Sequence, residues 1–580
     1  MEKRVLLAVV LSFVVLYGYQ AMVPPPKPTP PAPSTQKPAA APQPSAAGPA
    51  AQSPPAPALE HDPPAPAGAA PVVADTTERE IVVENDSIRG IFTTRGGALK
   101  SWKLKKYQDA AHAHFEIVPQ DAPKELPRPF VLTVDDPRIA ATLSQALFRP
   151  SATSLDLRNG PAVLTFEYAD ASGLSAKKQL SFDPRNPYVV HVSATITQGS
   201  SVLVPIVHWG PAPGNALDVN SSGYQMPPRP ILYRDGDVER VNVEDIAEVG
   251  NAEGLFGFAG VDDHYFMTAA VQLKEPVRLH FEPVPMPVRE GTEKPPPPYV
   301  AWSVRFKNAP SGAAFFAGPK DFDVLAAVDR ELVRAIDFGI FAFLVVPLLR
   351  ALKWVNTYVG NYGWSIIALT VLINIVMFPL RHKSVVSMRR MQEIQPEVKA
   401  IQDRYANLKM TDPGRQKMNT EMMALYKERG VNPASGCVPM LLTLPVLFAF
   451  YSMLSVAIEL RGAPFVGWIR DLSVYDPLFI TPILMGLTQF VQTKMTPSTA
   501  DPTQQRIMLL MPLVFMFMFI WAPSGLVLYW TVSNLWAIGQ QLVTNRIIGP
   551  TQPRTLRPPA ERKIKTAGAG RSDKASKERK

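Results

Sequence analysis

The sequence predicts a polytopic α-helical membrane protein with six transmembrane helices and a large extracytoplasmic antiparallel β-sandwich domain. Long apolar runs lie at the N-terminus and in the last two-fifths of the chain. Several approach the ~20 residues that an α-helix needs to cross the hydrocarbon core of a bilayer. The middle of the chain instead alternates apolar and polar residues, which is typical of strands with one buried face.

The first element, residues 1–23, is expected to be a transmembrane anchor. Lys3 and Arg4 precede an apolar run over residues 5–23, and basic flanks favour a cytoplasmic start. A cleaved signal peptide is the alternative. Tyr19 and Met22 flank Ala21, the one candidate cleavage position, where small residues would be needed. The sequence therefore favours an uncleaved anchor.

Residues 24–76 are predicted to form a disordered linker. They are mostly Pro, Ala and small polar residues up to residue 71. Such a composition buries too little apolar surface to fold, and its proline favours an extended chain.

Residues 77–320 are expected to form the β-sandwich, outside the cytoplasm because they follow the first span. Val190, Val192, Ala194 and Ile196 alternate with polar neighbours, and residues 300–307 repeat the pattern. One face of each strand should be buried and the other exposed to water. Many such strands separated by Pro and Gly turns indicate a sandwich.

This middle region contains few candidate catalytic or metal-binding residues. His112 and His114 are spaced for one strand face, and Asp262, Asp263 and His264 form an acidic–histidine cluster. Neither set has partners that fix a metal, so surface or loop positions are the favoured interpretation. The chain carries no convincing nucleophile motif or phosphate-binding loop. We expect no enzyme, no cofactor and no metal, and the single cysteine, Cys437, excludes an intrachain disulfide.

Residues 321–360 are predicted to be an amphipathic interfacial helix and a connector. One helical face carries Leu325, Val328, Leu332, Ile336, Ile340 and Phe343. The apolar run at 338–349 has about a dozen residues, too few to span a bilayer. A core helix of the soluble domain is the alternative.

Residues 361–550 are expected to form a five-helix core. The apolar segments are 363–380, 438–458, 478–491, 507–522 and 526–548, the third and fourth of them short. With the anchor they give six crossings. Both the loop at 381–432 and the tail at 551–580 then face the cytoplasm, and both are rich in Lys and Arg, as the positive-inside rule requires.

The loop at 381–432 is predicted to fold as a helical hairpin. Apolar residues at alternating spacings of three and four form a seam. Its expected residues are Met391, Ile394, Val398, Ile401 and Tyr405 on the outgoing helix, and Met418, Met422 and Leu425 on the returning one. The methionines either close this seam or provide an adaptable surface for varied apolar sequences.

Several motifs carry a family resemblance. They are Glu421-Met422-Met423-Ala424-Leu425-Tyr426-Lys427, the stretch from Asn432-Pro433 to Gly436-Cys437-Val438-Pro439, Pro482-Ile483-Leu484-Met485-Gly486 and Pro523-Ser524-Gly525-Leu526-Val527-Leu528-Tyr529-Trp530. With these motifs the chain resembles the YidC-type membrane protein insertases in their Gram-negative form. The match is dense over residues 329–548 and concerns layout more than motif before that.

The resemblance implies a hydrophilic groove that opens to the cytoplasm and to lipid and is closed toward the outside. It implies an insertase and chaperone of the cell inner membrane, with the β domain in the periplasm. Its partners would be nascent membrane proteins and the lipid bilayer, and also the Sec translocon and the ribosome. No small-molecule substrate, nucleotide or metal is implied.

The chain departs from the family at one position. The family places an arginine in the second span, where this chain has Asn374, and Arg381 lies at the cytoplasmic end of that span. We therefore expect a neutral, hydrogen-bonding groove, lined by Thr370, Asn374, Gln489, Tyr529 and Trp530. The alternative is that Asn374 joins two helices, a contact worth about 1 kcal/mol.

The basic tail at 551–580 is open to two interpretations. Its charges suit contact with ribosomal RNA, and they equally suit ordinary positive-inside composition.

Two functions other than insertion are possible alternatives. A transporter predicts inverted repeats and buried ionisable groups, and a scaffold that only anchors the β domain needs a single span.

Overall fold

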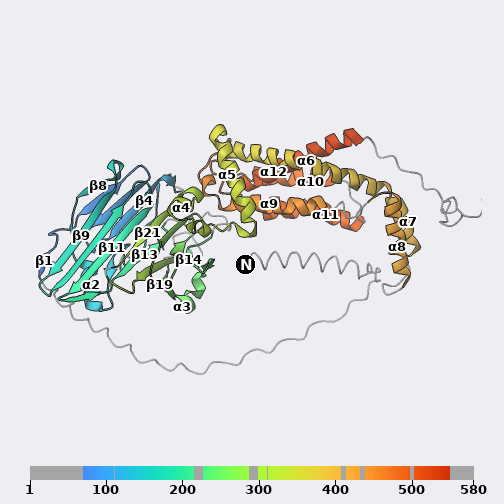
Figure 1. Ribbon diagram of the computed structural model, residues 1–580. Helices are drawn as coiled ribbons and strands as arrows, with labels where there is room; N and C mark the ends of the chain where they lie inside the picture. The colour runs from blue at the N-terminus through green and yellow to red at the C-terminus, as the bar shows by residue number, and fades with distance from the viewer. Residues whose placement is uncertain are drawn as a thin grey trace, which may run out of the picture.

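The computed structural model describes residues 70–109, 112–123, 125–214, 226–285, 298–309, 311–405, 413–431, 438–496 and 502–548. The expected anchor at 1–23 and the tail at 551–580 lie outside these ranges. A β domain and a helical bundle adjoin end to end, and a helical hairpin lies at the far end of the bundle (Figure 1).

The described residues of the β domain form three sheets. The largest has eleven strands and follows the order β1-β9-β10-β11-β21-β18-β17-β14-β15, with β12 beside β11 and β7 beside β9. Its strands are β1 (Pro71–Val73), β7 (Arg149–Pro150), β9 (Ala162–Asp170), β10 (Leu174–Phe182), β11 (Val189–Gln198), β12 (Ser201–Leu203), β14 (Arg229–Arg234), β15 (Asp237–Arg240), β17 (Phe258–Asp262), β18 (Phe266–Val271) and β21 (Ser311–Pro319).

The other two sheets have five strands each, in the orders β16-β19-β20-β13-β6 and β5-β4-β3-β2-β8. Their strands are β2 (Glu80–Glu84), β3 (Ile88–Thr93), β4 (Leu99–Gln108), β5 (His114–Glu116), β6 (Leu132–Thr133), β8 (Ser154–Asp156), β13 (Ile206–Ala212), β16 (Asn251–Gly254), β19 (Val277–Val284) and β20 (Tyr299–Arg305). Short helices α2 (Pro137–Gln145) and α3 (Ile246–Val249) join strands. The named strand pairs are antiparallel except β2 with β8, so a mostly antiparallel domain is confirmed.

Aromatic side chains fill the space between the sheets. Trp209 of β13 stacks on Phe315 of β21, with ring centroids 6.3 Å apart. Phe92 of β3 packs against Phe166 of β9 at 6.4 Å. Both five-stranded sheets therefore pack on the large sheet, and large buried rings dominate the core between the layers.

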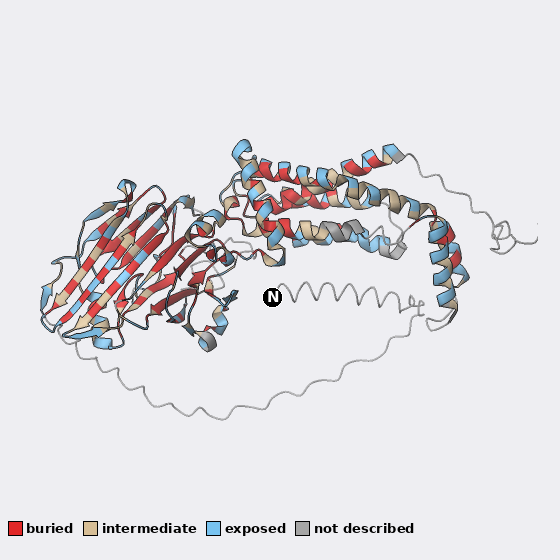
Figure 2. Cartoon of the chain, in the orientation of Figure 1, coloured by how far each residue is buried: buried red, intermediate tan, exposed pale blue. Residues whose placement is uncertain are grey.

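Alternation sets which strand faces are buried, although not everywhere. In β10 and β11 buried and exposed residues alternate, as the sequence predicts (Figure 2). β20 differs, because six of its seven residues are buried. Val284, Tyr299 and Ala301 pack with Leu126, so a loop covers the face that alternation predicts to be wet.

The β domain begins earlier than expected. Pro71–Val73 forms β1 and pairs with β9, with Pro71 opposite Asp170. The prediction that the linker extends to residue 76 is therefore wrong at its end. Residues 24–69 lie outside the described part of the chain.

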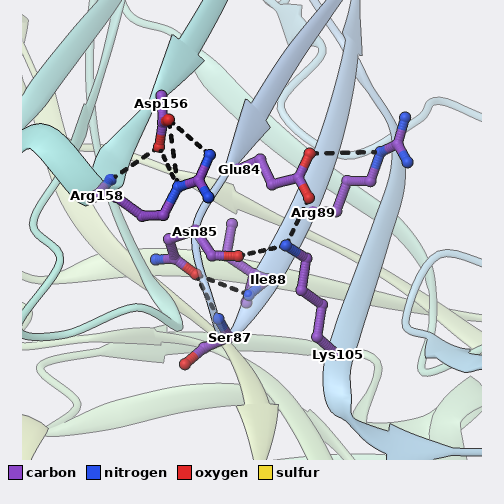
Figure 3. Close-up of polar contacts among 8 residues, drawn as sticks. All are labelled: Glu84, Asn85, Ser87, Ile88, Arg89, Lys105, Asp156 and Arg158. Carbon is purple, nitrogen blue, oxygen red and sulfur yellow. Dashed lines mark hydrogen bonds and ion pairs between the residues drawn. The ribbon is translucent and has the colours of Figure 1, made fainter.

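The turn between β2 and β3 illustrates how polar residues close these strands (Figure 3). The Asn85 side chain accepts hydrogen bonds from the backbone N–H groups of Ser87 and Ile88. This local geometry favours asparagine in a tight turn. Lys105 Nζ lies 2.5 Å from both the Asn85 carbonyl oxygen and Glu84 Oε1, which fastens the turn to β4.

The connector after the β domain is not one amphipathic helix. It comprises α4 (Phe322–Val328), two 3-10 turns (Leu332–Ala335 and Gly339–Phe341) and α5 (Ala342–Val359). α4 ends where Asp329 takes an extended conformation, so the expected single helical face is broken. α5 lies at the end of the bundle that adjoins the β domain (Figure 1), and it exposes Phe343, Trp354 and Tyr358.

Five helices occupy the positions expected for the core spans. They are α6 (Tyr362–Glu393), α9 (Val438–Val456), α10 (Ile480–Met495), α11 (Pro502–Met518) and α12 (Ser524–Ile548). Within the described residues, two helical stretches are long and apolar enough to cross a membrane, 339–359 and 362–393. The first contains α5, which is longer than the dozen-residue run in the sequence.

The hairpin consists of the end of α6, α7 (Gln395–Arg404) and α8 (Pro413–Glu428). Ile394, Ile401 and Leu425 are buried, and Met391, Val398, Tyr405, Met418 and Met422 are half-buried. Arg429 Nη2 donates to Glu397 Oε1 at 2.6 Å, and the Tyr405 hydroxyl donates to Glu421 at 2.7 Å. These contacts join the two helices along the expected seam. Met423, at 58% exposure, is the methionine that fits an open surface.

Candidate functional site

A cavity of about 150 Å³ lies between α6, α9 and α12. Polar groups line it on α6 and α12, and apolar groups on α9. Its lining is Thr370, Ile373, Asn374, Met377, Arg381, Val446, Leu447, Phe450, Tyr529, Trp530 and Ser533. Four of the five residues expected in the groove, Thr370, Asn374, Tyr529 and Trp530, are thus brought together.

Spacing along α6 explains the polar wall. Thr370, Asn374 and Arg381 are four and seven residues apart, so they lie on one face of the helix. Asn374 Nδ2 donates to the Thr370 carbonyl oxygen at 2.7 Å, and Arg381 Nη1 donates to Asn374 Oδ1 at 2.7 Å. Both bonds of Asn374 remain within α6, which does not support the interpretation of Asn374 as a link between helices.

Arg381 corrects the expectation of a neutral groove. Its guanidinium folds back along α6 and reaches Asn374, about two turns earlier. The cavity therefore contains a positive charge, although the position at which the family places arginine holds asparagine. The seven-residue spacing is the sequence signal that could have identified Arg381.

Gln489 is not part of this lining. It lies on α10, is half-buried, and its Oε1 atom has no hydrogen-bond partner. The polar contact between α10 and α12 instead uses Asn534, which donates to Thr488 Oγ1 and to the Met485 carbonyl oxygen. The structure therefore does not bring Gln489 together with the other four expected residues in this cavity.

The aromatic residues of α12 have different neighbours. The Tyr529 ring stacks on Phe450 of α9, with centroids 4.5 Å apart and planes 7° from parallel. Trp530 packs against Phe519, 5.0 Å away, and against Phe515 of α11. Tyr529 thus closes the cavity against α9, and Trp530 lies between the cavity and α11.

One end of the cavity helices is covered by residues 457–479, called here the α9–α10 loop. Ile458, Leu460 and Leu472 are buried in it, and Asp476 is fully buried. Asp476 accepts hydrogen bonds from the backbone of Leu478 and Thr481 and from Trp468 Nε1. The loop is therefore a packed unit with its own polar network.

The acidic–histidine cluster does not lie on the surface. Asp262, Asp263 and His264 are all buried. Asp262 forms ion pairs with Lys320 at 2.9 Å and with Arg240 at 3.2 Å. Burial lowers the pKa of His264 to about 4, so its imidazole is neutral near pH 7. Within the described ranges, no group of three or more His, Cys, Asp or Glu residues is placed to hold a metal ion.

Comparisons with known proteins cover nearly the whole chain. A family described as "60Kd inner membrane protein" matches residues 354–551, and one described as "YidC periplasmic domain" matches residues 80–351. A membrane protein insertase YidC from Geobacter metallireducens is 36% identical over 565 residues, which covers 95% of this chain and 100% of that protein. This chain belongs to the YidC family.

Other YidC proteins match over the same length. Relatives named membrane protein insertase YidC from Geotalea daltonii and Syntrophus aciditrophicus are each 36% identical, and each match covers 94% of this chain. The family resemblance inferred from the sequence motifs is confirmed. The boundary between the two matched YidC regions, near residue 351, falls within α5.

Proposed function

We propose that this chain inserts newly made proteins into the inner membrane and assists their folding. A polar flank of the substrate would enter the cavity between α6, α9 and α12 from the cytoplasmic side, and its apolar span would move into lipid. Membership of the YidC family supports the activity. The observation that best supports this mechanism is the hydrogen bond between Arg381 and Asn374, two polar side chains inside a largely apolar helical bundle.

The cavity addresses the main cost of insertion. A polar segment in hydrocarbon leaves backbone and side-chain groups without partners, each costing several kcal/mol. Asn374, Ser533 and the Tyr529 hydroxyl offer hydrogen bonds there, and Arg381 offers a charge to acidic residues. The apolar span then enters lipid with a gain of ~25 cal/mol per Å² removed from water. Partitioning supplies the energy, so the proposal needs neither a catalytic residue nor a nucleotide.

Exposed apolar side chains suit the lipid side of this path. α11 exposes Ile507, Leu510, Leu513, Val514 and Phe517, and α6 exposes Leu372, Ile375 and Val376. α10 and α11 have 16 and 17 residues. At ~1.5 Å per residue each is roughly 25 Å long, shorter than the ~30 Å hydrocarbon core. Short helices favour a locally thinned bilayer, which shortens the polar flank's passage.

The proposed membrane plan has six transmembrane helices with both termini in the cytoplasm. The anchor at 1–23 and the five core helices form the spans, and α5 lies at the periplasmic interface. The exposed aromatic residues of α5, Phe343, Trp354 and Tyr358, support this place for it, since Trp and Tyr concentrate at bilayer interfaces. The β domain is then periplasmic, and the hairpin and tail are cytoplasmic.

The proposed partners follow from that orientation. The hairpin would meet nascent chains as they leave the ribosome, and the Sec translocon would deliver longer substrates. The basic residues of the tail would contact ribosomal RNA. The assignment of these partners is supported by membership of the family and by the positive charge of the tail.

Reconstitution in liposomes tests the activity and the groove together. The purified chain is expected to insert a small two-span substrate with an acidic flank, without translocon or ATP. Arg381→Gln should lower the insertion rate about tenfold for this substrate, and less for one with a neutral flank, because it removes the cavity's charge. Asn374→Leu should lower the rate for both substrates, because it removes both the amide and the anchor of Arg381.

Arg390→Gln is the matched control, because Arg390 is an exposed arginine further along α6. It should retain the parent rate. Insertion by a folded Asn374→Leu chain at the parent rate would reject the groove, and equal losses for both flanks in Arg381→Gln would reject the role of its charge.

A further inference from the structure

The α9–α10 loop fastens together the helices that line the cavity. The backbone N–H groups of Ser524 and Gly525, at the start of α12, donate to the carbonyl oxygens of Val474 and Leu472. Asn361, which caps α6, donates to the Pro464 carbonyl oxygen at 3.0 Å. The loop also continues α9 directly. It therefore holds the same ends of α6, α9 and α12.

The contact between this loop and α6 is tight. A Cβ atom at Gly363, in the first turn of α6, would lie 2.1 Å from the ring of Phe465. Such a distance leaves room for glycine alone, so the loop and the helix are in direct contact. Displacement of the loop would therefore separate groups that now exclude water from this end of the bundle.

The β domain binds this loop through Arg461. The Arg461 guanidinium carbon lies 4.6 Å from the ring centroid of Phe115, 4.8 Å from that of Phe266 and 5.8 Å from that of Tyr265. Phe115 and Phe266 stack on each other at 3.9 Å. These rings form an aromatic cage, and the faces of such rings attract a cation. Phe115 and Phe266 come from different sheets, so the cage is part of the domain's core.

A second contact fixes the end of α9. His264 Nε2 lies 2.7 Å from the carbonyl oxygen of Ser455, in the last turn of that helix. A carbonyl oxygen only accepts, so the ring carries its proton on Nε2. A third contact joins the loop to α5: Lys353 of α5 pairs with Asp321 at 3.6 Å and with Glu459 of the loop at 3.2 Å, and also contacts Asp323.

The rings of the cage have packing contacts of their own. Phe115 and Phe266 are fully buried, stack on each other and belong to the hydrophobic core of the β domain. We therefore expect Arg461→Gln to leave these stacked rings in place and to loosen the loop, which keeps its backbone bonds to α12 and its contact with Asn361. Arg461 thus connects the loop, which has its own polar network, to rings that belong to the core of the β domain.

We propose that Arg461 is a positioning residue: the aromatic cage of the β domain holds the α9–α10 loop over the cavity and keeps it closed toward the periplasm. This inference rests on the proposed function, because it needs a groove that opens to the cytoplasm. It gives the β domain a mechanical role in insertion, which is to seal the end of the groove that must not leak.

Thiol labelling of the full chain in membrane vesicles tests the proposal. Cys437→Ser removes the single native cysteine, and Ser533→Cys places a probe in the cavity. A membrane-impermeant maleimide is added to either side. In the parent background we expect labelling from the cytoplasmic side only. Arg461→Gln should raise the labelling rate from the periplasmic side at least tenfold.

Two variants separate positioning from simple loss of structure. Arg461→Lys keeps a cation over the rings and should stay within about twofold of the parent rate. Arg470→Gln removes an exposed arginine of the same loop and should change nothing. A double-mutant cycle with Phe115→Leu should show non-additive rates, because both changes break one contact.

The outcomes distinguish the two proposals. Absence of labelling from the cytoplasmic side in the parent would refute the groove, and the role of Arg461 would fall with it. Normal cytoplasmic labelling with no periplasmic labelling in Arg461→Gln would refute the role of Arg461 alone. If Arg461→Gln does not fold, periplasmic labelling of the Phe115→Leu chain decides, and protection at the parent rate overturns the inference.

Discussion

At the scale of single residues, Arg381 adds a positive charge to the cavity between α6, α9 and α12. The sequence places it just past an apolar run, where a basic residue is expected at the cytoplasmic interface. Its long side chain instead reaches back to Asn374. Because this chain has Asn374 at the position where the family places arginine, the sequence predicts a neutral cavity. The charge is supplied from two turns away, because arginine is long enough to span that distance.

Another residue-scale prediction concerns acid stability. Burial, with a smaller effect from His280, lowers the pKa of His208 from 6.5 to about 4. The unfolded chain then binds more protons than the folded one between these values, so stability is lost as pH falls from about 6.5 to 4. The imidazole is half-buried and keeps part of its hydration, so the loss is roughly 1–3 kcal/mol.

His208→Gln should flatten this part of the pH profile. Glutamine does not titrate and can still hydrogen-bond Thr133, whose hydroxyl lies 2.7 Å from His208 Nε2. Denaturant unfolding of the full chain in detergent, followed by tryptophan fluorescence, gives the free energy at each pH. His191→Gln is the control, because His191 is exposed on β11. Parallel profiles for parent and His208→Gln would contradict the prediction.

At the scale of elements, helix positions were predictable and helix roles were less so. Apolar runs marked both ends of α9, α10, α11 and α12 and the start of α6 to within about five residues, because a helix crossing lipid or a bundle needs a long apolar stretch. α6 itself continues thirteen residues past its run, from residue 380 to Glu393. The prediction of an amphipathic interfacial helix within residues 321–360 was wrong in detail. Its apolar spacing continued through Asp329, but local capping and backbone geometry ended α4 there.

The helical hairpin formed by α7 and α8 provides an element-scale prediction. Leu425 is buried in the seam between α7 and α8. Leu425→Ala should cost about 2–4 kcal/mol, because it removes buried methyl groups and leaves a cavity. A short hairpin has little stability to lose, so backbone amides of residues 395–404 and 413–428 should exchange with deuterium much faster.

Met423→Ala is the control for this prediction. Met423 is on the same helix but exposed, so its loss should cost less than about 0.5 kcal/mol. Unchanged exchange in Leu425→Ala would show that the seam does not hold the hairpin together.

At the scale of the whole molecule, charge is separated along the chain. Residues 551–580 contain ten Lys and Arg residues and three Asp and Glu residues. The β domain mixes both signs, and its ion pairs are mostly exposed. In the proposed orientation the basic tail lies on the side where ribosomes dock.

Deleting residues 551–580 should weaken ribosome binding by the full chain at low salt. A chain that neutralises fewer RNA phosphates releases fewer counterions on binding, so the slope of log affinity against log salt should become shallower. Binding is measured by co-sedimentation across a range of salt concentrations. Replacing the ten basic residues by glutamine controls for length. Equal slopes for parent and deleted chains would show that the tail's charge does not contribute to ribosome binding. Membrane topology alone would then explain its basic residues.

The sequence by itself determined the division into a β domain and a helical core, together with the hairpin seam and four of the residues that line the cavity, Thr370, Asn374, Tyr529 and Trp530. Those features depend on composition and on periodicity along one element, which neighbouring residues fix. Only the tertiary structure decided that Arg381 enters the cavity, that Gln489 does not, and that the Asp262–His264 cluster is buried beside α9. The seven-residue spacing puts Arg381 on the same face of α6 as Asn374. The direction in which its side chain extends, like the placements of Gln489 and of the Asp262–His264 cluster, depends on side-chain reach and on contacts between segments far apart in the chain.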